Sequence, residues 1–320
     1  MKKIIPVILL LILLVNCKAS EEKEIKIKLL FAGDLMLDRG VKRSVYKNFN
    51  GEYIKLFEDH TNYFFMFDSV VVNLEGPISH KGKQIPKPYS FRFETNILRT
   101  LKEANINIVN LANNHIFDWS YEAFLDTIRN LEEYRINFFG IGDISNASIP
   151  YILIKTNKEN SIKVGFLGFS EFLKELKPSK KYPISFSVID EIKLKEIIPS
   201  TKSNVDFLIV CFHWGEEYKT RNNKTQEKIA KLCIDLGADL IIGHHPHVIQ
   251  NYEIYNGKYI FYSLGNFIFD QRFSKDTMKS GLVELEITKT SSNIQTTVKF
   301  TNLYQDYKTL KLISLPTDNH

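Results

Sequence analysis

The amino-acid sequence predicts an α/β protein with a mostly parallel or mixed β-sheet covered by helices. Short apolar runs rich in β-branched residues alternate with segments of helical periodicity, and no fixed-period repeat is present. With 320 residues, 44% hydrophobic residues and a formal net charge of +5, the composition excludes a disordered chain or a small disulfide scaffold. No Pro- or Ser-rich linker divides the chain, so one large domain is expected.

The five clearest strands are predicted at 26–32, 69–74, 106–112, 205–212 and 238–243. Helices are predicted at about 95–104, 120–134, 190–198 and 224–236. From residue 248 the pattern becomes all strand, with a hairpin signal at Asn256-Gly257, and this stretch is expected to supply much of a second sheet. Cys211 and Cys233 lie in apolar runs and are predicted as buried thiols, with a single disulfide as the alternative.

Residues 1–16 are predicted to form an export signal. Two lysines precede an apolar run that ends at Val15, which is shorter than the roughly 20 residues of a membrane-spanning helix but typical of a signal peptide. Cys17 follows in the string LLVNC, which resembles the lipidation motif of bacterial lipoproteins, although Asn16 stands where a small residue is usual. We therefore expect an envelope lipoprotein tethered to the membrane through residues 17–25, with simple secretion as the alternative.

The distribution of charge argues against a nucleic-acid partner. Basic residues gather only in Lys174–Lys181, a run that also contains Glu175 and Pro178 and is typical of a solvated loop. The string FFGIGDIS has Ser145 in place of the third glycine of a dinucleotide-binding fingerprint. No P-loop string and no GxSxG string occur in the sequence.

Chemically active residues follow every one of the five predicted strands. The strands end in Gly33-Asp34, Glu75-Gly76, Asn113-Asn114-His115, His213-Trp214-Gly215 and Gly243-His244-His245-Pro246-His247. Five of the eight histidines of the chain fall within these strings. Because ligands bind outside the carboxyl edge of open α/β sheets, we expect these separated strings to converge on one site.

Imidazole, carboxylate and amide ligands without cysteine suit Mn, Fe or Zn. His245 and His247 project in the same direction only if the backbone is extended, and the intervening Pro246 favours extension. Each imidazole would then serve one of two neighbouring metal ions. Such a pair activates water and clamps an oxyanion, which is the chemistry of phosphoryl hydrolysis.

Six ordered strings, FAGDLML, VVNLEGPI, NLANNH, FHWGEEY, GHHPHVIQ and FYSLGNFIFD, resemble those of the CapA family. This family is named for capsular poly-γ-glutamate synthesis and is a branch of the calcineurin-like metallophosphoesterases. The match extends over about residues 27–271. It implies a four-layer α-β-β-α sandwich of the metallophosphoesterase type at 26–305, followed by a C-terminal tail at 306–320.

The resemblance implies six ligands for one or two divalent metal ions, Mn, Fe or Zn: Asp34, Glu75, Asn114, His213, His245 and His247. Asp34 and His247 belong to a first metal site, and Glu75 takes the position of the bridging carboxylate. The other three belong to a second site. Three further residues match catalytic or site-organising positions: His115, Arg39 and Asn266. Of these, His115 is implied to stabilise the transition state or to protonate the leaving group.

Two positions depart from the wider superfamily. Met36 stands where ordinary metallophosphoesterases carry a histidine, in the GDxML form that CapA-type chains share. Since a thioether is a poor ligand for Mn or Zn, the site is expected to hold one tight and one loose metal ion, or one only. His244 is expected to point away from His245, either supporting the ligands or lying on the surface.

The functional expectation that follows is a surface-tethered, metal-dependent hydrolase or transferase. It would act in synthesis, release or anchoring of an anionic capsule or envelope polymer such as poly-γ-glutamate, together with capsule synthesis and export proteins. Two alternatives stay open. One is a non-catalytic, polymer-binding component of such an assembly, and the other is a general periplasmic phosphodiesterase acting on phosphoesters.

Overall fold

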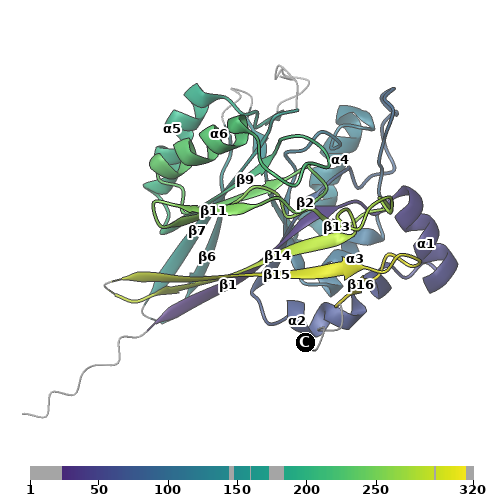
Figure 1. Cartoon of the computed structure of the whole chain (residues 1–320), viewed down its shortest axis with the longest axis horizontal. Helices are drawn as coiled ribbons and strands as arrows, with labels where there is room; N and C mark the ends of the chain where they lie inside the picture. The colour runs from purple at the N-terminus through teal and green to yellow at the C-terminus, as the bar shows by residue number, and fades with distance from the viewer. Residues whose placement is uncertain (1–23, 144–147, 159, 173–183, 292, 315–320) are drawn as a thin grey trace, which may run out of the picture.

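A computed structural model describes residues 24–143, 148–158, 160–172, 184–291 and 293–314. Within these ranges two β-sheets face each other and helices cover both outer faces, which confirms the predicted α-β-β-α sandwich (Figure 1). The predicted export signal with Cys17 and the basic run Lys174–Lys181 lie outside the described residues. Among the helices that are described, none has the length and apolar character needed to cross a membrane.

The larger sheet contains eight strands of the described chain in the order β16-β15-β14-β1-β2-β3-β4, with β13 pairing beside β1. Its strands are β1 (Ile25–Leu35), β2 (Ser69–Leu74), β3 (Ile106–Asn110), β4 (Asn137–Phe139), β13 (Asn266–Ile268), β14 (Lys279–Lys289), β15 (Ile294–Gln305) and β16 (Leu312–Ile313). The first four strands and β13 run parallel, so their carboxyl ends lie at the same edge. At this edge Asp34 pairs in register with Asn73 of β2 and Asn266 of β13.

The smaller sheet has the order β11-β12-β10-β9-β7-β6. Its strands are β6 (Tyr151–Thr156), β7 (Ser161–Ser170), β9 (Phe207–His213), β10 (Leu240–His244), β11 (Tyr252–Tyr255) and β12 (Lys258–Phe261). The central strands β7, β9, β10 and β12 are parallel, and His213 pairs with His244 at their carboxyl ends. A separate pair is formed by β5 (Ile141–Gly142) and β8 (Ser185–Phe186).

Three of the predicted helices are confirmed, as α3 (Ile97–Glu103), α4 (Ser120–Glu133) and α6 (Lys224–Asp235). The fourth, α5 (Glu191–Lys202), continues past its predicted end and through Pro199, and Thr201 in its last turn is still buried. Four further elements were not predicted from the sequence: α1 (Arg39–Phe49), α2 (Thr61–Phe64) and the 3₁₀ turns Tyr53–Leu56 and Glu58–His60.

The alternation of side chains along the strands builds the layers. In β1, Ile27, Leu29 and Phe31 join the core between the two sheets, whereas Leu30 and Ala32 pack under the helices of the larger sheet. In the smaller sheet Cys211 faces the inter-sheet core, while Cys233 of α6 packs on the opposite face. Both are free, buried thiols, so the predicted thiols are confirmed and the alternative disulfide is wrong.

The strands after residue 248 are divided between the two sheets. The predicted hairpin is confirmed, since Asn256 and Gly257 connect β11 to β12 with φ angles of 47° and 73°. However, only β11 and β12 join the smaller sheet, and β13 to β16 complete the larger one. The expectation that this stretch supplies much of the second sheet is therefore wrong, because β14 pairs antiparallel with β1 over Ile25–Phe31.

A close backbone contact fixes the start of the site. The amide N–H of Asp34 donates to the carbonyl oxygen of Gly265 over 2.9 Å, and a Cβ atom on Gly33 would lie only 1.9 Å from that oxygen. Only glycine at position 33 lets the two segments approach this closely. The position of the Asp34 carboxylate therefore depends on the Gly33 backbone.

Candidate metal centre

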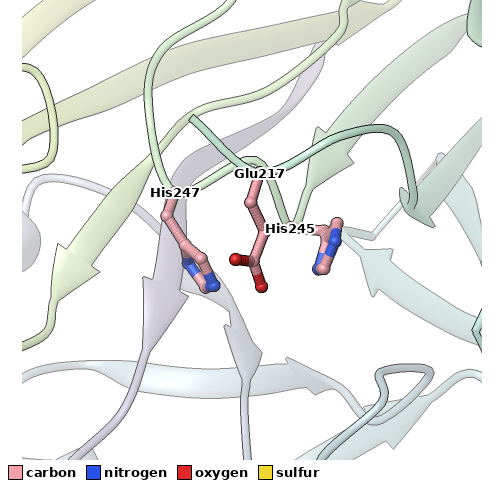
Figure 2. A group of neighbouring side chains, drawn as sticks. All are labelled: Glu217, His245 and His247. Carbon is pink, nitrogen blue, oxygen red and sulfur yellow. The ribbon is translucent and has the colours of Figure 1, made fainter. Parts of the chain in front are cut away.

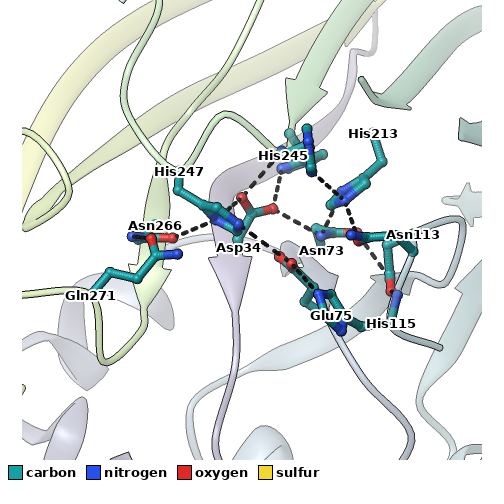
Figure 3. Close-up of polar contacts among 12 residues, drawn as sticks. Asp34, Asn73, Glu75, Asn113, His115, His213, His245, His247, Asn266 and Gln271 are labelled. Carbon is teal, nitrogen blue, oxygen red and sulfur yellow. Dashed lines mark hydrogen bonds and ion pairs between the residues drawn. The ribbon is translucent and has the colours of Figure 1, made fainter. Parts of the chain in front are cut away.

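The ends of strands from both sheets converge, as the sequence predicts (Figure 3). Asp34 lies at the carboxyl end of β1, one residue before its last, and its Oδ2 atom accepts a hydrogen bond from the backbone N–H of His245 over 3.2 Å. His213 ends β9 in the smaller sheet, and its Nε2 atom lies 2.9 Å from Oδ1 of Asn114. The facing carboxyl edges of the two sheets therefore form a single polar site.

Asp34, Glu75 and His247 form the first group of potential ligands, with one ligand atom from each lying within 4.8 Å of the others. The Nδ1 atom of His247 lies 3.0 Å from Oδ1 of Asn266 and 3.2 Å from Oδ2 of Asp34. Since both of those oxygens only accept hydrogen bonds, Nδ1 carries a proton. The other ring nitrogen, Nε2, faces Oε1 of Glu75 at 3.7 Å.

Glu75 is fully buried, and neither of its carboxylate oxygens has a hydrogen-bond partner among the described residues. Burial raises the pKa of Glu75 well above its usual value, and the nearby charge of Asp34 raises it further. Burial alone would lower the pKa of His247, but the charges of Glu75 and Asp34 raise it to about 9. His247 and His115 face Glu75 at 3.7 and 3.9 Å, but neither forms a hydrogen bond with it. The buried carboxylate therefore keeps unfilled acceptor positions, and this pocket fits a bound cation.

Asn114, His213 and His245 form the second group of potential ligands. Besides its contact with Asn114, Nε2 of His213 lies 3.2 Å from Nδ1 of His245. Burial holds the pKa of His213 well below its usual value, and burial with the charge of His247 lowers the pKa of His245 to about 3. Both rings are thus neutral at physiological pH. Neutral imidazoles converging with an amide oxygen form a donor set for Mn, Fe or Zn.

Glu217, in the loop after β9, is a further potential ligand that the sequence analysis did not single out. One ligand atom each from Glu217, His245 and His247 lies within 4.8 Å of the others, and the Glu217 carboxylate reaches between the two imidazoles (Figure 2). Unlike the other acidic ligands it is exposed. The signal in the sequence was the acidic pair of the string FHWGEEY, which directly follows a strand end.

The loop after β10 corrects two expectations. His245 and His247 have φ angles of 98° and 58°, so a turn with left-handed residues, and not extended backbone, brings their rings together. His244 is 2% exposed, with Nδ1 at 3.6 Å from Oδ1 of Asp34, so a surface position for this residue is wrong. It lies behind the Asp34 carboxylate, and burial lowers the pKa of His244 to about 4.

Met36 belongs to the apolar core beneath the larger sheet. Its sulfur accepts a hydrogen bond from the backbone N–H of Asp38 over 3.2 Å. The thioether is therefore held by the chain that follows it, and the first ligand group consists of Asp34, Glu75 and His247 without a fourth side chain from this position.

Asn73 connects the two ligand groups, although the sequence analysis gave it no role. Its Nδ2 atom donates to Oδ1 of Asp34 over 2.8 Å and lies 3.3 Å from Nδ1 of His213. Its Oδ1 atom accepts from the side-chain amides of Asn110 and Asn113 over 3.1 and 3.3 Å. These amides are buried, so the network both satisfies and orients the groups behind the ligands.

His115 forms a pair with Asp118. Its Nδ1 atom donates to Oδ2 of Asp118 over 2.7 Å, and its ring stacks on Phe91 with centroids 4.0 Å apart. Lys87 forms an ion pair with the same carboxylate. Burial lowers the pKa of His115, while Asp118 opposes that shift. The free Nε2 atom lies 3.9 Å from Oε1 of Glu75, so this imidazole borders the candidate metal centre.

Arg39 and Asn266 both lie at the site, as the resemblance implies. A cavity of about 240 Å³ is lined by Arg39, His115 and His247, among others. The Arg39 guanidinium pairs with Asp270 over 3.1 Å and lies over the rings of Tyr89 and Phe91. Asn266, besides its contact with His247, donates from Nδ2 to the carbonyl oxygen of Thr277 over 2.9 Å. Asn266 thereby fixes the orientation of the His247 ring.

Comparison with known proteins relates the sequence of this chain to a family. The model of the bacterial capsule synthesis protein family PGA_cap matches residues 28–271. The capsule biosynthesis protein CapA of Bacillus anthracis is 34% identical over 274 residues, which cover 82% of this chain and 64% of that protein. The PGA biosynthesis protein CapA of Bacillus subtilis is 32% identical over 262 residues, covering 81% and 67%. The chain thus spans about two thirds of the length of these relatives.

Similar solved structures include the protein TT1561 of Thermus thermophilus, with a TM-score of 0.45 and 12% identity over 85% of this chain and 99% of that chain. Another is the Thermus thermophilus sulfate thiohydrolase SoxB, with a TM-score of 0.42 and 14% identity. That likeness covers 77% of this chain and 41% of SoxB.

The Asn73 network can be tested by Asn73→Ala. The change removes one hydrogen-bond partner each from Asp34, His213 and the two buried amides, so we expect the free energy of unfolding to fall by about 3 kcal/mol. Urea denaturation followed by circular dichroism measures this loss. Asn302→Ala, at an exposed position of β15, is the matched control and should change it by less than about 0.5 kcal/mol. Equal stabilities of the two variants would contradict the structural role of Asn73.

Proposed function

Because this chain belongs to the PGA_cap family of bacterial capsule synthesis proteins, we propose that it acts in making, releasing or anchoring an anionic capsule polymer such as poly-γ-glutamate. Two relatives, from Bacillus anthracis and Bacillus subtilis, are named for capsule and PGA biosynthesis, which supports this substrate class. A more distant relative from Mycobacterium tuberculosis, 27% identical over 214 residues, is named as a probable polyglutamine synthesis accessory protein. The proposed activity is that of a metal-dependent hydrolase or transferase.

One observation carries the catalytic part of the proposal: Glu75 is a fully buried carboxylate whose two oxygens have no hydrogen-bond partner in the described chain. Its Oε1 atom lies 3.7 Å from Nε2 of His247 and 3.9 Å from Nε2 of His115. Asp34, Glu75 and His247 would hold one divalent ion, and Asn114, His213 and His245 would hold a second with Glu75 in common. A bound ion of this kind supplies Lewis acidity and a water of lowered pKa.

The remaining residues of the cavity would handle the substrate and its protons. Asp118 holds a proton on Nδ1 of His115, which leaves Nε2 directed at the cavity as the atom that gives or takes a proton. The carboxylate also stabilises the imidazolium form, so His115 can protonate a leaving group. Arg39 adds a positive charge to the wall of the same cavity, where it can contact an anionic group of the substrate.

Elemental analysis by mass spectrometry of purified residues 18–320 tests the metal site directly. We expect one to two Mn, Fe or Zn ions per chain, and loss of the metal in His213→Ala, His245→Ala, because two neutral imidazole ligands are removed. His80→Ala changes an exposed histidine and should keep the metal. No bound metal, even after reconstitution, would overturn the enzymatic proposal and favour the alternative of a polymer-binding component.

The role of His115 is tested on whichever substrate the metal-loaded protein cleaves in a screen of phosphoesters and polyglutamate. His115→Ala should lower kcat about 10²- to 10⁴-fold without loss of metal, because proton transfer to or from the reacting group is removed. Asp118→Asn keeps the imidazole and should reduce kcat less. Full activity of His115→Ala on every cleaved substrate would refute the catalytic assignment.

We also propose that the protein is exported and anchored to the cell envelope through a lipid on Cys17. Cells fed a labelled fatty acid should incorporate the label into the full chain, and Cys17→Ala should abolish the incorporation because the acceptor thiol is missing. The same variant should move from the membrane fraction to the soluble fraction. Unchanged membrane association of an unlabelled chain would contradict lipid anchoring.

A further inference from the structure

A second cavity, of about 700 Å³, adjoins the candidate metal centre and is lined by four basic residues: Arg43, Lys47, Arg272 and Lys308. We propose that this cavity binds successive anionic groups of a polymer chain whose neighbouring unit occupies the metal centre. That the polymer continues into the metal centre rests on the proposed function. Binding of a polyanion in the basic cavity can be measured separately from any catalysis. The chemistry recognised is a repeated carboxylate or phosphate.

The basic groups of this cavity have no ion-pair partner among the described residues. Arg43 and Lys47 lie four residues apart on α1 and are exposed, so their like charges face the same side of the helix. In the described ranges of the chain, none of the four basic side chains forms an ion pair. Arg272 also has a buried Nε atom without a hydrogen-bond partner among the described residues. An anion in the cavity would supply the missing acceptor and counter-charge.

Asp270 is the one acidic residue among the described residues that line this cavity, and its charge is paired with that of Arg39. Its Oδ1 atom pairs with Arg39 over 3.1 Å, and its Oδ2 atom accepts from the backbone N–H of Gly40 over 2.9 Å. A Cβ atom at position 40 would lie 2.7 Å from this side chain, so glycine permits the contact. The cavity consequently keeps an excess of positive charge.

The position of Asp270 also joins the two cavities. It lines both the basic cavity and the cavity that contains His115 and His247. Much of the wall of the basic cavity is built from α1 and the turn after β15, which lie side by side (Figure 1). A hydrogen bond connects these two segments, since Oγ of Ser44 donates to the carbonyl oxygen of Thr309 over 2.7 Å. A ligand with a single charge would reach only part of this wall. A flexible chain with repeated charges can meet basic residues from α1, from the loop after β13 that holds Arg272 and from the turn after β15, and still extend to the metal centre.

The test is the double variant Arg43→Gln, Lys47→Gln in metal-loaded residues 18–320. Fluorescence anisotropy measures its affinity for labelled poly-L-glutamate, with inorganic polyphosphate and free glutamate as parallel probes. We expect the Kd for at least one of the two polymers to rise about fivefold, with a weaker dependence on salt, because two exposed charges are lost. Lys195→Gln, Lys224→Gln removes the same charge from α5 and α6 and should leave the Kd unchanged.

The possible results separate this inference from the proposed function. Equal Kd values for the wild type and the α1 variant would overturn the basic cavity as the polymer site, even if the protein cleaves the polymer. A raised Kd in a protein without metal or turnover would support the cavity while refuting the hydrolase. A raised Kd for polyphosphate alone would support the cavity and assign its ligand to phosphate polymers. An equal rise in Kd in both double variants would show that only the net charge of the protein matters, and this would overturn the proposal.

Discussion

The structure is organised around two fully buried carboxylates, Asp34 and Glu75, whose charges must be compensated inside the protein. Hydrogen bonds from His247 and Asn73 and the neighbouring His charges hold the pKa of Asp34 below its usual value despite the opposing effect of burial. Glu75 has no such bonds within the described chain, so it is left to a cation to compensate its charge. The close approach at Gly33, the amide network behind the site and the histidines beside it all place partners around these two groups.

The two-sheet architecture explains how these partners come from distant parts of the chain. Parallel strands end at a common edge, and the facing of the two sheets puts the end of β9 and β10 opposite the end of β1 and β2. Asn73 contacts both Asp34 and His213, so its side chain connects the sheets at the site itself. The ligand geometry therefore depends on the packing of the sheets, and a shift of one sheet would separate the two ligand groups.

The convergence of the strand ends was predictable because polar residues after apolar runs are visible in the sequence. The supporting residues were not. Asn73 lies within an apolar strand and Asp118 follows a loop, and each gains its role from a partner that only the tertiary fold brings near. The loop of His245 and His247 was misjudged because Pro246 favours extension locally, whereas the chain adopts positive φ angles on both sides of it. The strands after residue 248 are divided between the two sheets because β14 pairs with β1, and no local sequence pattern encodes that pairing.

The distribution of charge then relates the metal centre to the proposed polymer. Three carboxylates, Asp34, Glu75 and Glu217, belong to the potential ligand groups, and each one that is ionised opposes the approach of an anionic chain. Bound divalent ions would neutralise these carboxylates and add positive charge beside the basic cavity. Under the proposed function, metal binding and polymer binding are therefore coupled, because the polymer gains full access to the centre only after the carboxylates have been neutralised.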